Sequence, residues 1–228
     1  MGKTPGQKAA RVKGFKMSES EILRKIAVIF VTDVVGFSTL MAQNEELTLR
    51  SFRSCKEILD NLFEEHSGRI FNTAGDSVLA EFPSAVSAVI CAVEFQKLIK
   101  ARNASVPNAA QMQFRIGLNM GDVIIEGTNL YGDGVNVAAR LEALSQAGGV
   151  CLSKSIHDFV SQKVDLGFQD IGAQQVKNTN VHAFDVSIGG LAPRQIAPTP
   201  PAIEPVEAGA PPSIAVLPFK NMSTDAEQ

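Results

Sequence analysis

The sequence has no excess of positive charge. Its 228 residues include 21 Lys and Arg and 24 Asp and Glu, which gives a formal net charge of −3 at pH 7. Proteins that bind nucleic acid through its backbone need clustered basic side chains to neutralise many phosphates. The composition therefore argues against a general nucleic-acid binder, and we expect no nucleic acid among the partners.

Cysteine is also scarce. The chain has three cysteines, Cys55, Cys91 and Cys151, which lie far apart inside apolar, periodic stretches. An odd number of cysteines without the spacing of metal ligands is typical of reduced, buried thiols rather than of a disulfide framework. We therefore expect a cytoplasmic protein.

Long hydrophobic runs are missing from the sequence. A helix that crosses a bilayer needs about 20 consecutive apolar residues, and no run approaches that length. The basic residues near the N-terminus are not followed by a hydrophobic region, so we expect no signal peptide. Membrane insertion of this stretch of chain is not expected either.

The distribution of residue types predicts one domain between polar or proline-rich ends. Residues 1–20 are polar and basic without a period, and we expect them to form a flexible tail. Residues 21–188 have the alternating composition of a globular domain. Residues 189–212 hold seven of the eleven prolines, which is typical of an extended linker. Residues 213–228 begin with an apolar, strand-like run, which indicates the start of a truncated C-terminal domain.

Six apolar or β-branched residues, 26–31, precede a carboxylate at Asp33. An uninterrupted run of this length predicts a strand that is buried on both faces. A carboxylate at the end of such a strand needs a cation, a set of hydrogen-bond donors or a proton to offset its burial. The alternative is that Asp33 caps a helix that starts near Ser38 or Thr39.

The turn at 34–38 follows directly. Gly36 can adopt positive φ, and the backbone N–H groups of the turn could form a small anion cradle. A carboxylate next to such a cradle indicates a metal ion that is bound together with phosphate.

The remaining pattern predicts an α+β fold. Alternating apolar residues and turn residues indicate strands, whereas apolar residues three and four apart indicate helices. The predicted helices are 47–63, 84–102, a segment from 132 that ends before Gly148, and 154–160. The predicted strands are 69–82 as a hairpin through Gly75 and Asp76, 112–118 and 123–126 joined by a turn at 121–122, 150–152, 164–171 and 181–186. This order matches an antiparallel-rich, ferredoxin-like βαββαβ sheet with helices on one face and extra strands at the C-terminal end.

Asp33 and Asp76 end two strands that this topology places side by side. Two carboxylates in the same space repel each other unless divalent cations lie between them. Oxygen ligands at the ends of rigid strands suit Mg²⁺ or Mn²⁺. Two such ions could activate a hydroxyl and stabilise a leaving pyrophosphate. The alternative is a pair of unrelated turn aspartates.

Three segments resemble, in order and spacing, the motifs of class III nucleotidyl cyclase catalytic domains. They are Phe-Val-Thr-Asp-Val-Val-Gly-Phe-Ser at 30–38, Asn-Thr-Ala-Gly-Asp-Ser-Val at 72–78 and Gly-Asp-Gly-Val-Asn-Val-Ala-Ala-Arg-Leu-Glu at 132–142. The resemblance covers about residues 24–187 and implies conversion of ATP to 3′,5′-cyclic AMP and pyrophosphate. Residues 213–222 are similar to the segment that follows such domains in bacterial proteins with a TolB-like or repeat-containing C-terminal half.

The resemblance also implies roles for single residues. Asp33, Asp76 and the Val34 carbonyl would bind two Mg²⁺ or Mn²⁺ ions per site. Asn136 and Arg140, which lie one helical turn apart, look like the family's transition-state pair, in which an amide orients the ribose and a guanidinium meets charge on the α-phosphate. The residues implied in binding the substrate are Gly36, Phe37, Ser38, Asn72, Asn129 and Lys177.

Each of these assignments has a plainer alternative. Arg140 could instead form a salt bridge with Glu142 or another acid, and Lys177 could be an ordinary solvated lysine. In the family, the metal aspartates and the Asn/Arg pair come from different subunits, so a head-to-tail homodimer with two shared sites is implied.

Two positions depart from the family pattern. Most adenylyl cyclases of the family read the base with a lysine and an aspartate, where this sequence has Asn72 and Asn129. Each amide can donate and accept, so both adenine and guanine could be accommodated. We expect weaker base selectivity, with ATP as the first choice of substrate. The alternatives are a guanylyl cyclase that uses GTP and a nucleotide-binding regulatory module without turnover.

Overall fold

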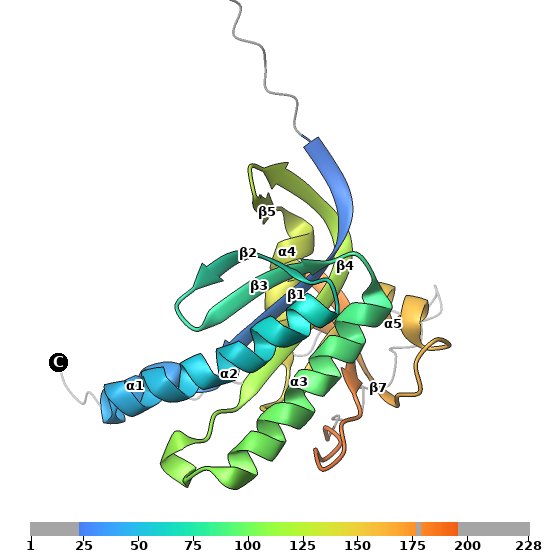
Figure 1. Ribbon diagram of the computed structural model, residues 1–228. Helices are drawn as coiled ribbons and strands as arrows, with labels where there is room; N and C mark the ends of the chain where they lie inside the picture. Colours follow the sequence, from blue (N-terminus) through green and yellow to red (C-terminus); the bar gives the residue numbers. More distant parts are fainter. Residues whose placement is uncertain (1–22, 177–178, 196–228) are drawn as a thin grey trace, which may run out of the picture. The chain divides into compact units, whose positions relative to one another are not determined.

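The computed structural model describes residues 23–176 and 179–195 (Figure 1). The predicted tail, most of the predicted linker, the segment 213–228 and Lys177 lie outside the described residues, so the predicted domain bounds stay predictions.

The strands form one sheet in the order β2–β3–β1–β4–β6–β8–β7, and β5 pairs separately with β4. Their bounds are β1 Leu23–Val34, β2 Arg69–Ala74, β3 Ser77–Phe82, β4 Phe114–Glu126, β5 Asn129–Tyr131, β6 Val150–Ser153, β7 Phe168–Val176 and β8 Thr179–Val186. The α-helices are α1 Phe37–Gln43, α2 Glu45–Glu65, α3 Ala85–Ser105, α4 Asp133–Leu144 and α5 Lys154–Val160. In the described residues, no helix has both the length and the apolar character that a membrane span requires.

The first four strands and the helices between them give the predicted βαββαβ unit. β1 lies between β3 and β4 and is antiparallel to both, and β2 pairs with β3. β6 pairs parallel with β4, and β8 and β7 extend the sheet beyond it. The α+β, ferredoxin-like fold with extra C-terminal strands is therefore confirmed.

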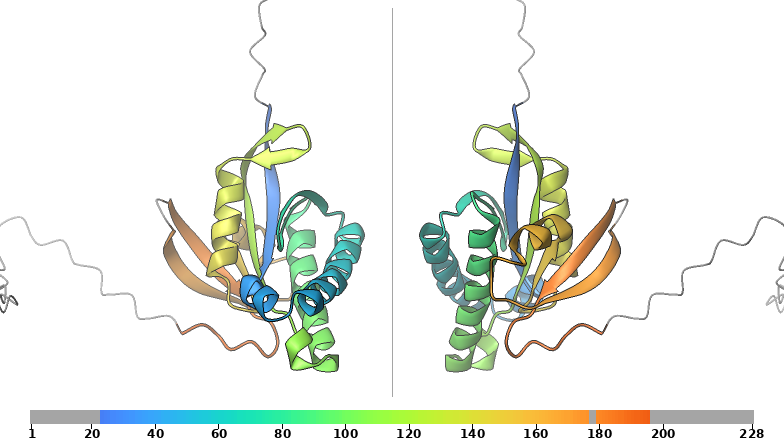
Figure 2. Two further views of the ribbon diagram at one scale, coloured as in Figure 1. Left: turned by 90° about the vertical axis from the view of Figure 1, so that its left-hand side faces the viewer. Right: turned by 90° about the vertical axis from the view of Figure 1, so that its right-hand side faces the viewer.

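β1 is covered on both faces. Val28 and Phe30 pack among residues of α2 and α3, whereas Ile29 and Val31 pack against α4 on the opposite face (Figure 2). The expected burial of both faces is confirmed for residues 27–31, whereas Ile26 at the start of the predicted run is 74% exposed. The expectation that all helices lie on one face is wrong, because α4 covers the other face of the sheet.

Helix α4 lies directly on β4 at Gly117. A Cβ atom at this position would lie 2.1 Å from the backbone nitrogen of Glu142 and 2.2 Å from the carbonyl oxygen of Ala138. No side chain fits between the helix and the strand, so a glycine is required for this close approach.

β4 runs without a break through residues 121–122, so the predicted turn there is wrong. The hairpin to β5 turns instead at Gly127, whose φ is +60°. A Cβ at Gly121 would lie 3.3 Å from the Cα of Gly134 on α4. The glycine at 121 thus serves helix packing rather than chain reversal.

The strand expected at 164–171 begins later, at Phe168. Residues after α5 continue in a turn, in which the N–H groups of Lys163 and Val164 donate to the carbonyl of Val160. This turn delays the return of the chain to the sheet.

Candidate functional site

Asp33 and Asp76 meet at the end of β1. Asp33 is the second-last residue of β1, and Asp76 lies in the turn between β2 and β3. The backbone N–H of Val34 donates a hydrogen bond of 2.9 Å to Oδ2 of Asp76. Because the N–H and C=O of a strand residue point toward the same neighbouring strand, the Val34 carbonyl also lies on the Asp76 side of β1. The structure thus brings these three residues together, while their role stays a prediction.

Arg115 holds Asp33 in this structure. The two residues are partners in the β1–β4 register. The Nε of Arg115 donates to Oδ1 of Asp33 at 3.1 Å and Nη2 donates to Oδ2 at 2.7 Å, a two-pronged, charge-assisted pair. This hydrogen bond is the largest cause that raises the pKa of Arg115.

Arg115 was not among the predicted site residues. A signal for it was present, since an arginine alternates with buried Phe114 and Ile116 on the strand predicted at 112–118. An arginine on the face opposite to these buried residues favours an acidic partner on the neighbouring strand, on the same face of the sheet as the arginine.

Glu142 of α4 adds a third carboxylate. Its Oε1 lies 3.0 Å from Nε of Arg115, but the single Nε hydrogen is donated to Asp33, so this contact is not an aligned hydrogen bond. Burial raises the pKa of Glu142 to about 8, and its hydrogen bond with Asp33 and the negative charge there act in the same direction. One guanidinium therefore balances several acidic groups, with the charge of Asp76 also within electrostatic range.

The donor set suits a hard divalent cation. Carboxylate oxygens of Asp33 and Asp76 and the backbone carbonyl of Val34 are ligands that Mg²⁺ or Mn²⁺ accepts. Within residues 23–176 and 179–195, no cluster of three or more His, Cys, Asp or Glu is arranged to hold a metal alone. Further ligands would have to come from other groups than these, and phosphate oxygens have the right chemistry. A cation at Asp33 would also have to displace the Arg115 guanidinium.

The turn after β1 has the predicted glycine conformation. Gly36 has φ +69° and immediately precedes α1, whose first turn has no side-chain cap. The alternative that Asp33 caps this helix is therefore wrong. Phe37 packs edge-on against Phe52 of α2, with ring centroids 5.5 Å apart, whereas Gly36 and Ser38 are exposed beside the end of β1.

Asn136 and Arg140 lie one turn apart on α4. Asn136 is exposed and Arg140 is half-buried. Nη1 of Arg140 is buried without a hydrogen-bond partner in the described part of the chain. The alternative salt bridge to Glu142 is not formed, because the acid pairs with Arg115. A buried guanidinium nitrogen without a partner is costly, so this side chain gains from a change of position that brings it a hydrogen-bond acceptor.

Asn72 and Asn129, the two residues that differ from the family pattern, lie on neighbouring elements. Asn72 is exposed at an irregularity in β2, and Asn129 begins β5 and donates to the hydroxyl of Tyr131 at 3.3 Å. Arg69 of β2 donates to the carbonyl of Thr128 at 2.9 Å, which places the start of β2 beside the β4–β5 turn. Lys177 lies outside the described residues.

Comparison with known proteins identifies relatives for most of the chain. The family model described as "Adenylate and Guanylate cyclase catalytic domain" matches residues 18–187. A curated relative from Rhizobium meliloti, putative adenylate cyclase 3, is 44% identical over 216 residues, which cover 93% of this chain and 36% of the relative. The chain thus spans about a third of that relative's length.

Solved structures agree with the fold. An adenylate/guanylate cyclase/hydrolase from Silicibacter pomeroyi is 36% identical with a TM-score of 0.66, and the match covers 72% of this chain and 96% of the other. The adenylyl cyclase CyaB from P. aeruginosa is 23% identical with a TM-score of 0.64, covering 78% and 99% of the two chains. Because its sequence identity is low, this second similarity supports the fold alone.

Proposed function

We propose, since the chain belongs to the family of adenylate and guanylate cyclase catalytic domains, that it converts ATP to 3′,5′-cyclic AMP and pyrophosphate. In this reaction the ribose 3′-oxygen forms a bond to the α-phosphorus and its proton passes to solvent. The bond from the α-phosphorus to the bridging oxygen of the β-phosphate breaks, and pyrophosphate leaves. The observation that carries the proposal is the meeting of Asp33 and Asp76 at the end of β1.

Asp33, Asp76 and the Val34 carbonyl would hold two Mg²⁺ or Mn²⁺ ions. Such ions lower the pKa of the attacking hydroxyl and neutralise the leaving pyrophosphate. Arg115, if released from Asp33 by such binding, would keep its contact with Glu142 and would lie near the bound phosphates. Arg115 can then donate to the triphosphate, because guanidinium groups match phosphate oxygens in geometry and charge.

Asn136 and Arg140 would complete the site of a partner subunit. Both lie on one side of α4, and one nitrogen of Arg140 is buried without a partner in the described residues. With the Arg140 side chain turned toward the partner's site, an external phosphate would accept hydrogen bonds from the guanidinium as negative charge builds on the α-phosphate. Asn136 would orient the ribose. A homodimer with two shared sites follows if each subunit supplies the acids of one site and the Asn/Arg pair of the other.

The remaining predicted contacts concern the triphosphate and the base. Gly36, Phe37 and Ser38 form the exposed turn beside the acids, where backbone N–H groups can meet phosphate oxygens. Lys177 would add positive charge at the triphosphate. Asn72 and Asn129 would read the base with neutral hydrogen bonds, which discriminate less than charged ones.

The test is formation of cyclic nucleotide by the purified chain with Mn²⁺, run in parallel with ATP and GTP. Asp33→Ala and Arg140→Ala should each lower the rate by about 100-fold or more. Matched controls are Asp60→Ala and Arg50→Ala, which remove exposed members of ion pairs on α2 and should leave the rate unchanged. Equal rates in all five proteins would refute the proposal.

Mixing the two inactive variants tests the shared site. In an equimolar mixture, about half of the dimers contain one of each variant, and each of these has one intact site of two, so roughly a quarter of the original rate should return. No recovery would exclude the shared arrangement. Product from GTP alone would establish the guanylyl alternative, and saturable nucleotide binding without product would establish the regulatory module.

A further inference from the structure

Arg194 connects the end of the described chain to the last residue of α4. Its Nε and Nη2 donate to the two carboxylate oxygens of Asp185 on β8, at 2.7 and 3.1 Å. The same Nη2 also donates to the carbonyl oxygen of Leu144 at 2.7 Å. Leu144 is the C-terminal residue of α4. A single side chain therefore joins the segment that follows β8 to the helix that carries Asn136 and Arg140.

The backbone of Arg194 is fixed as well. Its N–H donates to Oε1 of Gln169 on β7 at 2.9 Å, and Nε2 of Gln169 donates back to its carbonyl at 2.7 Å. The Asp185 carboxylate is 9% exposed and the Arg194 side chain 28% exposed, so the ion pair is largely shielded from water. With the backbone and the side chain both held, Arg194 provides a rigid contact for α4 rather than a loose surface pair.

A positive charge is favourable at the C-terminal end of helix α4. The last carbonyls of a helix lack partners within the helix, and a cation there is favourable because of the helix dipole. The last turn of α4 contains no basic residue of its own. Arg194 supplies that charge from a distant part of the chain.

The contact is one helical turn from Arg140. Asn136, Arg140 and Leu144 are spaced by four residues, so they form one stripe along α4. A change in the position of the last turn therefore changes the direction of the Arg140 side chain. Small displacements of such a group have large effects on a rate that depends on near-attack geometry.

We propose that Arg194 is a positioning residue that sets the placement of Arg140 by holding the C-terminal end of α4. The proposal rests on the proposed function, in which Arg140 stabilises the transition state. Arg194 lies beyond the residues 18–187 that the family model matches and is the last residue of the compact unit. The activity of this domain is thereby made dependent on the segment that leads out of it.

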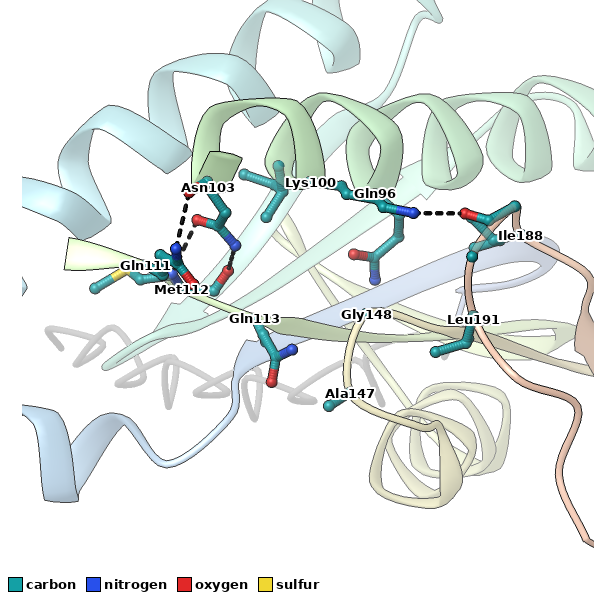
Figure 3. A pocket seen from close by; sticks show the side chains of 13 residues that line it. Gln96, Lys100, Asn103, Gln111, Met112, Gln113, Ala147, Gly148, Ile188 and Leu191 are labelled. Carbon is teal, nitrogen blue, oxygen red and sulfur yellow. Dashed lines mark hydrogen bonds between the residues drawn. The ribbon is translucent and has the colours of Figure 1, made fainter. Parts of the chain in front are cut away.

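A second contact on the same segment offers a matched control. Nζ of Lys100 on α3 donates to the carbonyl of Gly189 at 2.9 Å, and among the described residues it forms no hydrogen bond or ion pair with α4. Figure 3 shows Lys100 and Gln96 on one side, and Ile188 and Leu191 on the other side, of a cavity of about 250 Å³. Lys100→Ala removes a hydrogen bond near the start of the segment that follows β8. It leaves the contact between Arg194 and Leu144 in place.

The experiment compares Arg194→Ala, Arg194→Lys and Lys100→Ala with the unaltered 228-residue chain. Two quantities are measured: kcat and KM for ATP with Mn²⁺, and amide hydrogen exchange of residues 141–145 without nucleotide. Arg194→Ala should lower kcat about tenfold with KM changed less than about twofold, and should speed exchange at the end of α4. Arg194→Lys keeps one charged contact and should recover part of kcat, whereas Lys100→Ala should match the unaltered chain.

Each other outcome overturns the proposal. Unchanged exchange in Arg194→Ala would show that Arg194 does not hold α4, and faster exchange with an unchanged kcat would show that the reaction does not depend on this contact. An equal loss of kcat in Lys100→Ala would assign the effect to general anchoring of the segment. If the unaltered chain forms no cyclic nucleotide, the proposed function fails with the positioning role, while the exchange measurement still decides separately whether Arg194 holds the helix.

Discussion

Arg115 and Asp33 face each other across the β1–β4 pair, and the guanidinium of Arg115 donates to both carboxylate oxygens of Asp33. Glu142 lies 3.0 Å from the same guanidinium. The acidic end of β1 is therefore already compensated by a positive charge that belongs to the chain. Cations and this arginine compete for the same oxygens, which has consequences for stability.

Replacement of Arg115 by alanine should lower the free energy of unfolding by about 1 to 3 kcal/mol, because partly buried carboxylates lose their hydrogen-bonded partner. The measurement is urea unfolding in the presence of a chelator. Divalent cations should restore part of the loss, since they bind the folded acids. Arg50→Ala, which removes an exposed pair on α2, should change the free energy by less than about 0.5 kcal/mol. An equal effect of the two substitutions would contradict this view of Arg115.

Glu142 should make the fold less stable as the pH rises. Burial and the neighbouring Asp33 raise its pKa from 4.5 to about 8. The folded chain therefore keeps this proton where the unfolded chain releases it, so the free energy of unfolding falls between about pH 4.5 and 8. Glu142→Gln mimics the protonated acid and should lose less stability across this window. Urea unfolding at pH 5.5 and 8.0 with a chelator checks the difference, and parallel losses in both proteins would rule out this assignment.

Gly117→Ala should be among the most damaging single substitutions. The added methyl group would overlap the backbone of α4 at Ala138 and Glu142, and backbone atoms cannot rotate away. We expect a loss of about 3 kcal/mol in the free energy of unfolding. Gly189→Ala is the matched control, because nothing lies within 4 Å of its Cβ position. Thermal unfolding of both variants measures the contrast, and similar melting temperatures would mean that the helix can move off the strand.

The double substitution Asn72→Lys and Asn129→Asp should increase selectivity for ATP over GTP. Each charged hydrogen bond contributes about 1 kcal/mol more than a neutral one, so the two together should raise the ratio of kcat/KM values roughly 30-fold. Asn61→Lys, at an exposed position of α2, controls for the added charge. An unchanged ratio would remove both residues from base recognition.

The strands and turns that carry the site residues are predicted from the sequence better than the side chains that contact them. The uninterrupted run 26–31 predicts a strand buried on both faces, which holds for residues 27–31 but not for the exposed Ile26. The Gly75–Asp76 turn correctly predicts the hairpin, because such a turn is a local pattern. The face covered by α4 was predicted wrongly. Periodicity shows which side of a helix is buried but not which face of a sheet it covers.

Contacts between residues that lie far apart in the sequence were also not predicted. Arg115 is paired with Asp33 across 82 positions, and Arg194 contacts Leu144 across 50. Alternation marks Arg115 as a polar residue on a strand, yet only the strand register shows that it faces a carboxylate. The signal for Arg194 is weaker still, since an arginine in a proline-rich stretch has the composition of a linker.

The backbone contact at Gly117 limits how α4 can move. The helix touches β4 there at Ala138 and Glu142, between the positions of Asn136 and Leu144. A second close approach, between Gly121 and Gly134, holds the N-terminal end of the helix on the same strand. With two such contacts along its length the helix can shift only as one rigid unit, so a displacement at Leu144 is carried to Asn136, about 12 Å away.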